Sequence, residues 1–109
     1  VNVSKVGDVR VVRFSDSAIL DPANIEQLGD ELLSLVEKRS KLLLNFADIE
    51  FLSSAVLGKL IALEKHVRMN KGILKVCNIP AEIYEVFETT KLTNLLDIRR
   101  DQNDALKSF

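Results

Sequence analysis

The sequence of 109 residues contains one cysteine, one histidine, two prolines, four glycines and no tryptophan. A single cysteine, Cys77, excludes a disulfide framework within the chain and is typical of proteins from reducing compartments. A structural zinc site usually takes four cysteine and histidine ligands, and this chain offers only Cys77 and His66. These shortages predict a cytoplasmic domain that folds without a disulfide, a metal or a cofactor.

Long apolar runs and an excess of one charge are also missing. Runs such as Leu42-Leu43-Leu44 are far shorter than the roughly 20 residues that a membrane span needs. The first five residues lack the apolar core of a secretory signal. The 15 basic and 16 acidic residues give a net charge of −1, which provides no broad field for attracting nucleic-acid phosphates or anionic lipids. We therefore expect neither a nucleic-acid nor a membrane partner.

The hydrophobic pattern of the chain predicts strands that alternate with helices. Alternating residues over 1–6 and a valine-rich run over 7–14 indicate a hairpin, and further strands are expected at 18–20, 41–46, 73–77 and 95–98. Helices are expected from Asp21-Pro22 to about residue 40, over 55–70, from Pro80, and after a capping Asp101. This order predicts one α/β domain over residues 1–109, with a mixed, mostly parallel sheet and helices packed against it.

Residues suited to catalysis are few. Nucleophilic hydrolysis needs a serine or cysteine beside a base, usually histidine. On the expected helix over 55–70, His66 would lie about 18 Å from Ser54 along the helix axis. The G-x-S-x-G motif and the glycine-rich phosphate loops are absent from the sequence. The sequence therefore argues against an enzyme, and His66 is interpreted as a solvated helix residue and Cys77 as a small buried hydrophobe.

The most informative segment is FLSSAVLG, residues 51–58, in which a strand leads through a short turn into a helix that begins with Ser53 and Ser54. A helix start exposes unpaired N–H groups and the positive end of the helix dipole. A serine hydroxyl there caps the helix, and a phosphate there is held by the same donors. Phosphorylation would add about −1.5 to −2 charges at a place that tolerates them. The residues alone leave both interpretations open, a plain cap or a phosphorylated switch.

Residues 42–63, LLLNFADIEFLSSAVLGKLIAL, resemble the central signature of the STAS domain family in its anti-sigma factor antagonist branch. In that signature an apolar strand ending in Asn or Asp leads to Phe-x-Asp-Ser-Ser/Thr-Gly-Leu-Gly and the next helix. The likeness extends to residues 19–21, 72–79, 82–92 and 95–106. The resemblance implies a single STAS-like domain that acts by reversible protein binding.

The resemblance also implies site residues and partners. Ser54 falls on the family's phosphoacceptor serine, and Asp21 on an acidic position of the partner-facing surface. In the family, the unphosphorylated domain binds an anti-sigma factor that is also a serine kinase, which phosphorylates the domain with ATP, and a phosphatase reverses this step. The chain would act as a monomer or weak dimer. The implied partner-binding residues are Asp21, Ser53, Ser54, Val56 and Lys59.

Two positions depart from the family signature. Ser53 replaces the usual aspartate, which makes it a second candidate acceptor, and Ala55-Val56 replaces Ser/Thr-Gly. We expect Val56 to add bulk where the partner approaches. Two alternative functions stay open: a STAS scaffold in a signalling assembly that is never phosphorylated, and a module that binds a nucleotide or anion at the same helix start.

Overall fold

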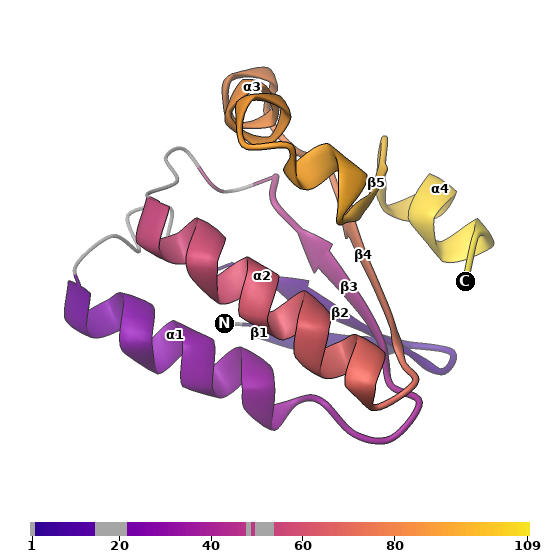
Figure 1. Cartoon of the computed structure of the whole chain (residues 1–109). Helices are drawn as coiled ribbons and strands as arrows, with labels where there is room; N and C mark the ends of the chain where they lie inside the picture. The colour runs from indigo at the N-terminus through magenta and orange to yellow at the C-terminus, as the bar shows by residue number, and fades with distance from the viewer. Residues whose placement is uncertain (1, 15–21, 48, 50–53) are drawn as a thin grey trace.

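A five-stranded sheet in the order β1-β2-β3-β4-β5 forms the centre of the molecule, as the computed structural model shows (Figure 1). The structure describes residues 2–14, 22–47, 49 and 54–109, so the strand expected at 18–20, Asp21 and Ser53 lie outside the described residues. The strands are β1 (Asn2–Val6), β2 (Val9–Arg13), β3 (Lys41–Asn45), β4 (Ile73–Cys77) and β5 (Asp97–Arg99). The helices are α1 (Pro22–Ser34), α2 (Ser54–Met69), α3 (Ala81–Thr89) and α4 (Gln102–Lys107), with a 3₁₀ helix at Leu92–Asn94.

The pairing of the strands confirms the expected mixed, mostly parallel sheet. β1 runs antiparallel to β2 through a turn at Gly7, whose φ of 63° favours glycine. The other pairs, β2–β3, β3–β4 and β4–β5, are parallel. The apolar run Leu42-Leu43-Leu44 fills β3, in the middle of the sheet, and all three side chains are buried. A short uninterrupted apolar run is what a strand covered on both faces requires.

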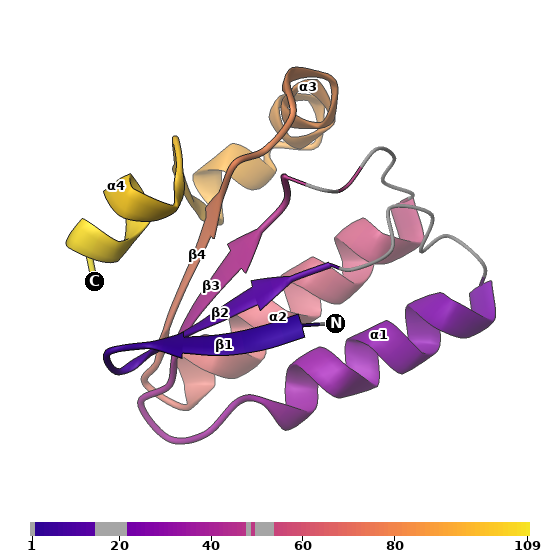
Figure 2. The ribbon, with the colours of Figure 1, turned by 180° about the vertical axis from the view of Figure 1, so that it is seen from behind.

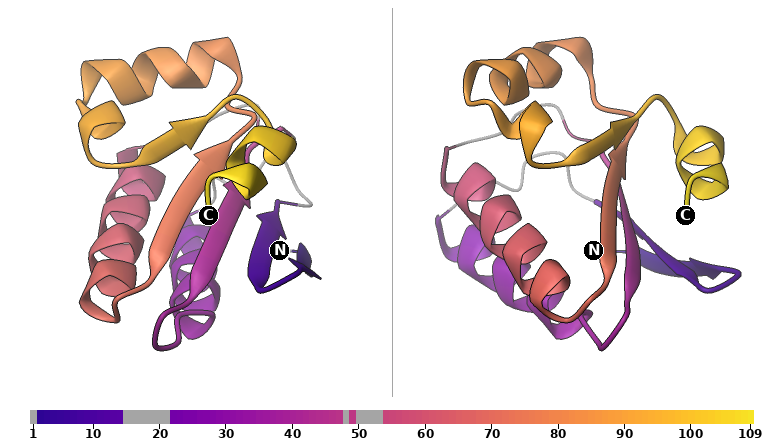
Figure 3. Two further views of the ribbon diagram at one scale, coloured as in Figure 1. Left: turned by 90° about the vertical axis from the view of Figure 1, so that its right-hand side faces the viewer. Right: turned by 45° about the vertical axis from the view of Figure 1, so that its right-hand side comes forward.

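The helices cover the two faces of the sheet unequally. α1 and α2 lie side by side over one face, while α4 alone lies on the other face (Figures 1 and 3). The larger core lies under α1, α2 and α3 and includes Leu32, Leu60 and Phe87. The smaller core lies under α4 and consists of Val9, Val11, Leu43, Cys77 and Ala105. Among the described residues, none of the helices has the length and apolar content needed to cross a membrane.

Two elements differ from the sequence-based expectation. Helix α1 ends at Ser34 rather than near residue 40, because Ser40 closes a turn on Glu37: its hydroxyl donates to the Glu37 carbonyl, 2.7 Å away, and accepts from the Glu37 N–H. The last strand begins at Asp97 rather than residue 95. The N–H groups of Leu95 and Leu96 instead donate to the Leu92 carbonyl and complete the 3₁₀ turn.

Candidate functional site

The helix start at which we expected the site lies at the carboxyl edge of the sheet. Helix α2 begins at Ser54, as the sequence predicted to within one residue, and follows β3. The N-terminal ends of α1 and α2 lie on the same side of the molecule, beyond the ends of β2 and β3 (Figure 2). In open α/β sheets this edge is the usual place for ligand and partner sites. Asp21 and Ser53 lie outside the described residues, so their distances from Ser54 stay predictions.

Three phenylalanines form a packed row beneath this edge. Phe14 follows β2 and Phe46 follows β3, and their ring centroids lie 5.4 Å apart at an interplanar angle of 71°. Phe87 of α3 contacts Phe46 edge-on, with centroids 6.0 Å apart. All three side chains are buried. Such edge-to-face contacts fix ring positions, so the carboxyl ends of β2 and β3 are held firmly against each other and against α3. Sequence reasoning missed this row, although Phe14 and Phe46 each end an apolar strand.

Asn45 fixes the start of the connection between β3 and α2. This side chain is only 4% exposed, and its amide nitrogen donates to Gln102 Oε1 at 3.1 Å. Its amide oxygen accepts from the N–H of Ala47 at 3.0 Å, and the N–H of Phe46 donates to the Cys77 carbonyl. Because a buried amide must find both donors and acceptors, these bonds determine how the chain leaves the strand. The strand-ending Asn of the signature is therefore a positioning residue.

Over residues 55–58, α2 presents small residues to the outside and large ones to the core. Val56 and Leu57 are buried, at 6% and 7% exposure, while Ala55 and Gly58 are exposed. No atom lies within 4 Å of a Cβ built on Gly58. The expectation that Val56 adds bulk at the partner-facing surface does not hold for this structure, because the Val56 side chain packs inward with the core. The exposed side of this turn therefore carries little side-chain bulk.

Lys59 joins the two helices next to this turn. Its ammonium nitrogen lies 3.1 Å from Glu26 Oε2 of α1, and its side chain is 30% exposed. The methylene chain of Lys59 crosses Gly29 closely, since a Cβ built on Gly29 would lie 2.8 Å from Lys59 Cδ. Exposed ion pairs contribute at most about 1 kcal/mol, so the contact orients the two helices more than it stabilises them. Of the predicted site residues, the structure thus places Ser54, Val56 and Lys59 on one helix.

His66 lies well away from the start of α2 on the same helix. His66 is exposed and lies three turns further along α2, and its solvated position agrees with the sequence-based interpretation. Within the described ranges, no group of three or more His, Cys, Asp or Glu side chains is arranged to hold a metal ion. The N-terminal end of α2 carries the positive end of the helix dipole, which favours an anion there.

A hollow lies at the carboxyl edge of the sheet, beyond β4 and β5. Its volume is about 330 Å³. Arg99, which lines it, is held by two hydrogen bonds to Asp97, of 2.8 and 3.3 Å. The sequence analysis predicted only a helix after Asp101 near this place, so the hollow was missed. Its lining residues are Ile79, Tyr84, Ile98, Arg99 and Arg100.

Comparison with known sequences identifies the family. Residues 1–105 match the family model described as the STAS domain. The chain belongs to the STAS domain family. BtrV of Bordetella bronchiseptica is 27% identical over 92 residues, which are 84% of this chain and 79% of BtrV. The anti-sigma-B factor antagonist of Bacillus subtilis is 24% identical over 98 residues, which are 90% of each protein.

Solved structures of STAS proteins share the fold. An anti-sigma factor antagonist (STAS) domain protein from Planctomyces limnophilus superposes with a TM-score of 0.86 at 20% identity, covering 98% of this chain and 95% of that one. The Bacillus cell fate determinant SpoIIAA in its phosphorylated form gives a TM-score of 0.71 at 16% identity, covering 98% and 96%. At these identities the likeness establishes the STAS fold, in agreement with the resemblance seen in the sequence.

Proposed function

We propose that this STAS domain binds and sequesters an anti-sigma factor with serine kinase activity, and that phosphorylation of Ser54 weakens the complex. A phosphatase would restore binding, and the cycle would take place in the cytoplasm. The observation that carries the proposal is the first part of α2, which begins at Ser54 and has the small residues Ala55 and Gly58 exposed. The relative named as an anti-sigma-B factor antagonist and the phosphorylated SpoIIAA neighbour support this choice.

The shape of the α2 start fits the approach of a protein partner. Residues 54 and 58 lie one turn apart on the same side of the helix. Because Gly58 has no side chain and faces open space, a partner can approach the backbone next to Ser54 closely. The contacts among Phe14, Phe46 and Phe87 fix the ends of β2 and β3 beneath this surface.

The charge of a phosphate explains how one modification can control this surface. About −1.5 to −2 charges at the N-terminal end of α2 face the positive end of the helix dipole, so the fold is retained. In an interface the same charges must be desolvated, and they repel acidic groups such as Asp21 if it lies nearby, as the family resemblance implies. Losing one to three contacts would weaken binding by about 1–3 kcal/mol, or several-fold to a hundredfold.

The direct test is phosphopeptide mapping after incubation of the protein with ATP and a lysate of its native host. We expect phosphate on Ser54, and no incorporation into a Ser54→Ala variant that keeps Ser53. A matched Ser53→Ala variant should still be phosphorylated. Phosphate on Ser53 alone would move the switch to the neighbouring serine. If neither serine is modified while a control antagonist in the same lysate is, the proposed switch is wrong and the unphosphorylated scaffold is the better explanation.

Binding measurements separate the proposed function from its alternatives. The Ser54→Asp variant should bind the isolated kinase more weakly than Ser54→Ala, whereas a scaffold would bind equally well in both forms. A nucleotide or anion module at the α2 start would show a thermal shift with ATP or GTP that Ser54→Asp abolishes. Lys59→Ala serves as a probe of the rim of the surface, because it removes the link to Glu26 without touching Ser54.

A further inference from the structure

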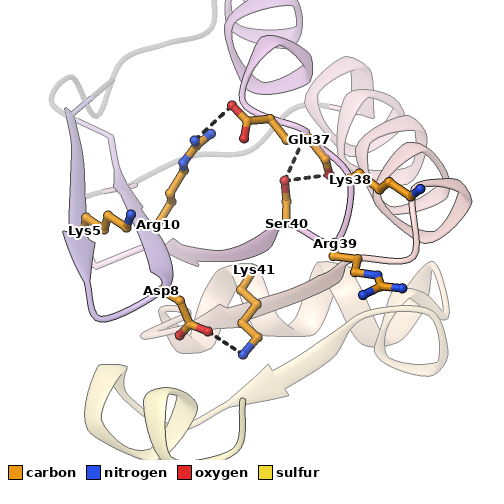
Figure 4. A pocket seen from close by; sticks show the side chains of 8 residues that line it. All are labelled: Lys5, Asp8, Arg10, Glu37, Lys38, Arg39, Ser40 and Lys41. Atoms are coloured by element: carbon orange, nitrogen blue, oxygen red, sulfur yellow. Dashed lines mark hydrogen bonds and ion pairs between the residues drawn. The ribbon is translucent and has the colours of Figure 1, made fainter.

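A polar cavity lies at the opposite edge of the sheet from the α2 start. Lys41 begins β3 at this edge, and the turn between β1 and β2 and the loop between α1 and β3 meet beside it (Figure 4). The cavity has a volume of about 170 Å³. Five of its eight lining residues are basic and two are acidic, in a chain whose net charge is −1. They are Lys5, Asp8, Arg10, Glu37, Lys38, Arg39, Ser40 and Lys41.

Both acidic groups at the cavity already have partners. Asp8 accepts a hydrogen bond from Lys41 Nζ at 2.7 Å, and this bond, with Lys5 contributing at longer range, lowers the pKa of Asp8 below its usual value. Glu37 accepts from Arg10 Nη2 at 3.1 Å. Asp8 and Glu37 are 76% and 67% exposed, and ion pairs so exposed to solvent contribute little to stability. A ligand of higher charge can therefore compete with them.

Unused donors remain on Arg10 and Lys5, which are register partners and extend from the same face of β2 and β1. Arg10 uses Nη1 on the Leu35 carbonyl, 2.9 Å away, and Nη2 on Glu37, which leaves about three of its five N–H groups. Lys41 neighbours Leu42, the register partner of Arg10, so its side chain leaves the opposite face of the sheet and turns to Asp8, away from Arg10. Lys5 extends from β1 toward Arg10 (Figure 4), and within the described part of the chain its side chain makes no hydrogen bond or ion pair. Lys38 and Arg39 stand at the rim and point outward.

The loop that carries half of this cavity is held firmly. The Arg39 N–H donates to the Asn70 carbonyl at 2.8 Å, and the Ser40 carbonyl accepts from Ile73 at 2.8 Å. The backbone of Ser40 also packs directly on Gly72, where an added Cβ would lie 2.5 Å from the Ser40 oxygen. Since the loop is fixed at both sides and Arg10 bonds to Leu35 and Glu37, the Arg10 guanidinium is largely placed before any ligand binds, which reduces the entropic cost of binding.

We propose that this cavity binds a small phosphoryl anion, such as a phosphate monoester or a diphosphate group. Guanidinium and ammonium groups around one hollow are the usual recognition elements for phosphate, and Arg10 can bind it through two N–H groups. The volume lies below the roughly 300–1,000 Å³ of pockets for drug-sized ligands, so only a group of phosphoryl size fits inside. The site is separate from Ser54, because it lies at the other end of β3, and it does not depend on the proposed switch.

Amide NMR titration at constant ionic strength tests the proposal, with pyrophosphate and inorganic phosphate as probes and chloride as the control. We expect saturable shifts at residues 5–10 and 37–41, with pyrophosphate bound more tightly than phosphate. A Lys5→Glu variant should bind at least tenfold more weakly. The matched Lys65→Glu variant changes an exposed lysine on α2, away from the cavity, and should bind like the wild type.

Two further comparisons complete the test. An Arg10→Lys variant keeps the charge but cannot bind a phosphoryl group through two N–H groups at once. It should therefore lower the affinity for pyrophosphate more than that for chloride. A phosphoserine peptide and a sugar monophosphate distinguish a protein-borne phosphoryl group from that of a metabolite, and tighter binding of either identifies the source. Shifts that grow linearly without saturation, or equal losses in Lys5→Glu and Lys65→Glu, would overturn the proposal, because both mean that only general charge attraction operates.

Discussion

The side chain of Lys59 in α2 lies across Gly29 in α1 and reaches Glu26, one turn earlier on the same helix. A glycine inside a helix ordinarily costs about 1 kcal/mol relative to alanine, which makes Gly29 look unfavourable in the sequence. The structure supplies its reason: a Cβ there would lie 2.8 Å from Lys59 Cδ. Gly29 leaves room for the ion pair of Lys59 with Glu26, which joins α1 and α2 beside the surface that we assign to partner binding.

Two glycine-to-alanine substitutions should therefore have different effects on stability. Gly58→Ala adds a methyl group where nothing lies within 4 Å, so it should raise the free energy of unfolding by about 1 kcal/mol through helix propensity. Gly29→Ala gains the same propensity but must displace Lys59, so its net gain should be clearly smaller. Urea denaturation monitored by circular dichroism measures both. An equal or larger gain for Gly29→Ala would show that Lys59 moves aside without cost.

The same Gly58→Ala variant should separate stability from function. If the partner approaches the backbone of α2 beside Ser54, an added methyl group blocks that approach and weakens binding even though the domain is more stable. We expect an affinity loss of several-fold or more for the isolated kinase, measured by calorimetry at a temperature where both forms are folded. Unchanged affinity would show that Gly58 lies outside the interface and that the partner contacts the surface around Lys59 instead.

Gly72 occupies the tightest contact among the glycines. A Cβ at this position would lie 2.5 Å from the Ser40 carbonyl oxygen and 3.0 Å from Val67 Cγ1. Backbone cannot give way as a flexible side chain does, so Gly72→Ala should lower the free energy of unfolding by about 1–3 kcal/mol. The loop at Ser40 should shift as well, which NMR shifts of residues 37–41 would show. A variant as stable as the wild type would mean that the loop packs more loosely than the structure indicates.

The alternation of periodic and apolar segments was enough to predict most of the fold. β4 was predicted at its observed bounds, and β3 and α2 to within one residue. A short run of three leucines favours a buried strand, and apolar residues at helical spacing favour an amphipathic helix. Asp101 also caps α4 as expected, accepting from the Asp104 N–H at 2.8 Å. The end of α1 was missed because the hydrogen bonds of Ser40 to Glu37 depend on a turn that hydrophobic spacing does not encode.

The candidate site was predictable in position but not in detail. The start of α2 at Ser54 follows from the change of periodicity, whereas the inward packing of Val56 depends on how the helix is rotated against the sheet. The row formed by Phe14, Phe46 and Phe87 joins residues far apart in sequence, and single-sequence patterns carry no signal for such pairs. The cavity at Lys5 and Arg10 was also missed, because its basic residues come from separate segments and the overall charge of the chain is balanced.

Asp97 makes stability depend on pH in the acid range. Burial alone would raise the pKa of Asp97, but hydrogen bonds from Lys75 and Arg99 outweigh it and lower the pKa below the usual 3.8. A carboxyl with a lowered pKa stabilises the fold at any pH above its unfolded value and loses that contribution as pH falls through its folded value. Its partner Lys75 is 5% exposed, and the ring of Phe109 lies 5.4 Å from its ammonium.

Asp97→Asn should therefore destabilise the domain at neutral pH, because it leaves the Lys75 charge buried without a carboxylate. Asp97 is 38% exposed, so we expect about 1–3 kcal/mol rather than the 3–5 kcal/mol typical of fully buried pairs. The difference from the wild type should stay constant from pH 7 to about 5 and narrow below pH 4, as the wild type loses its contribution. Urea unfolding at several pH values measures it. A difference that persists at pH 2.5 would show that packing, not charge, accounts for the loss.

Cys77 offers a measure of global unfolding that connects these variants. The thiol is fully buried, and burial raises its pKa to about 11, so it should not react with iodoacetamide at pH 8 in the folded state. Reaction should then proceed only through unfolded molecules, whose thiol has a pKa of about 8.5. Gly58→Ala should slow labelling about fivefold for each kcal/mol of added stability, and Gly72→Ala should accelerate it by the corresponding factor. Equal labelling rates in all three proteins would mean that local motion of α4, which covers Cys77, exposes the thiol without unfolding the sheet.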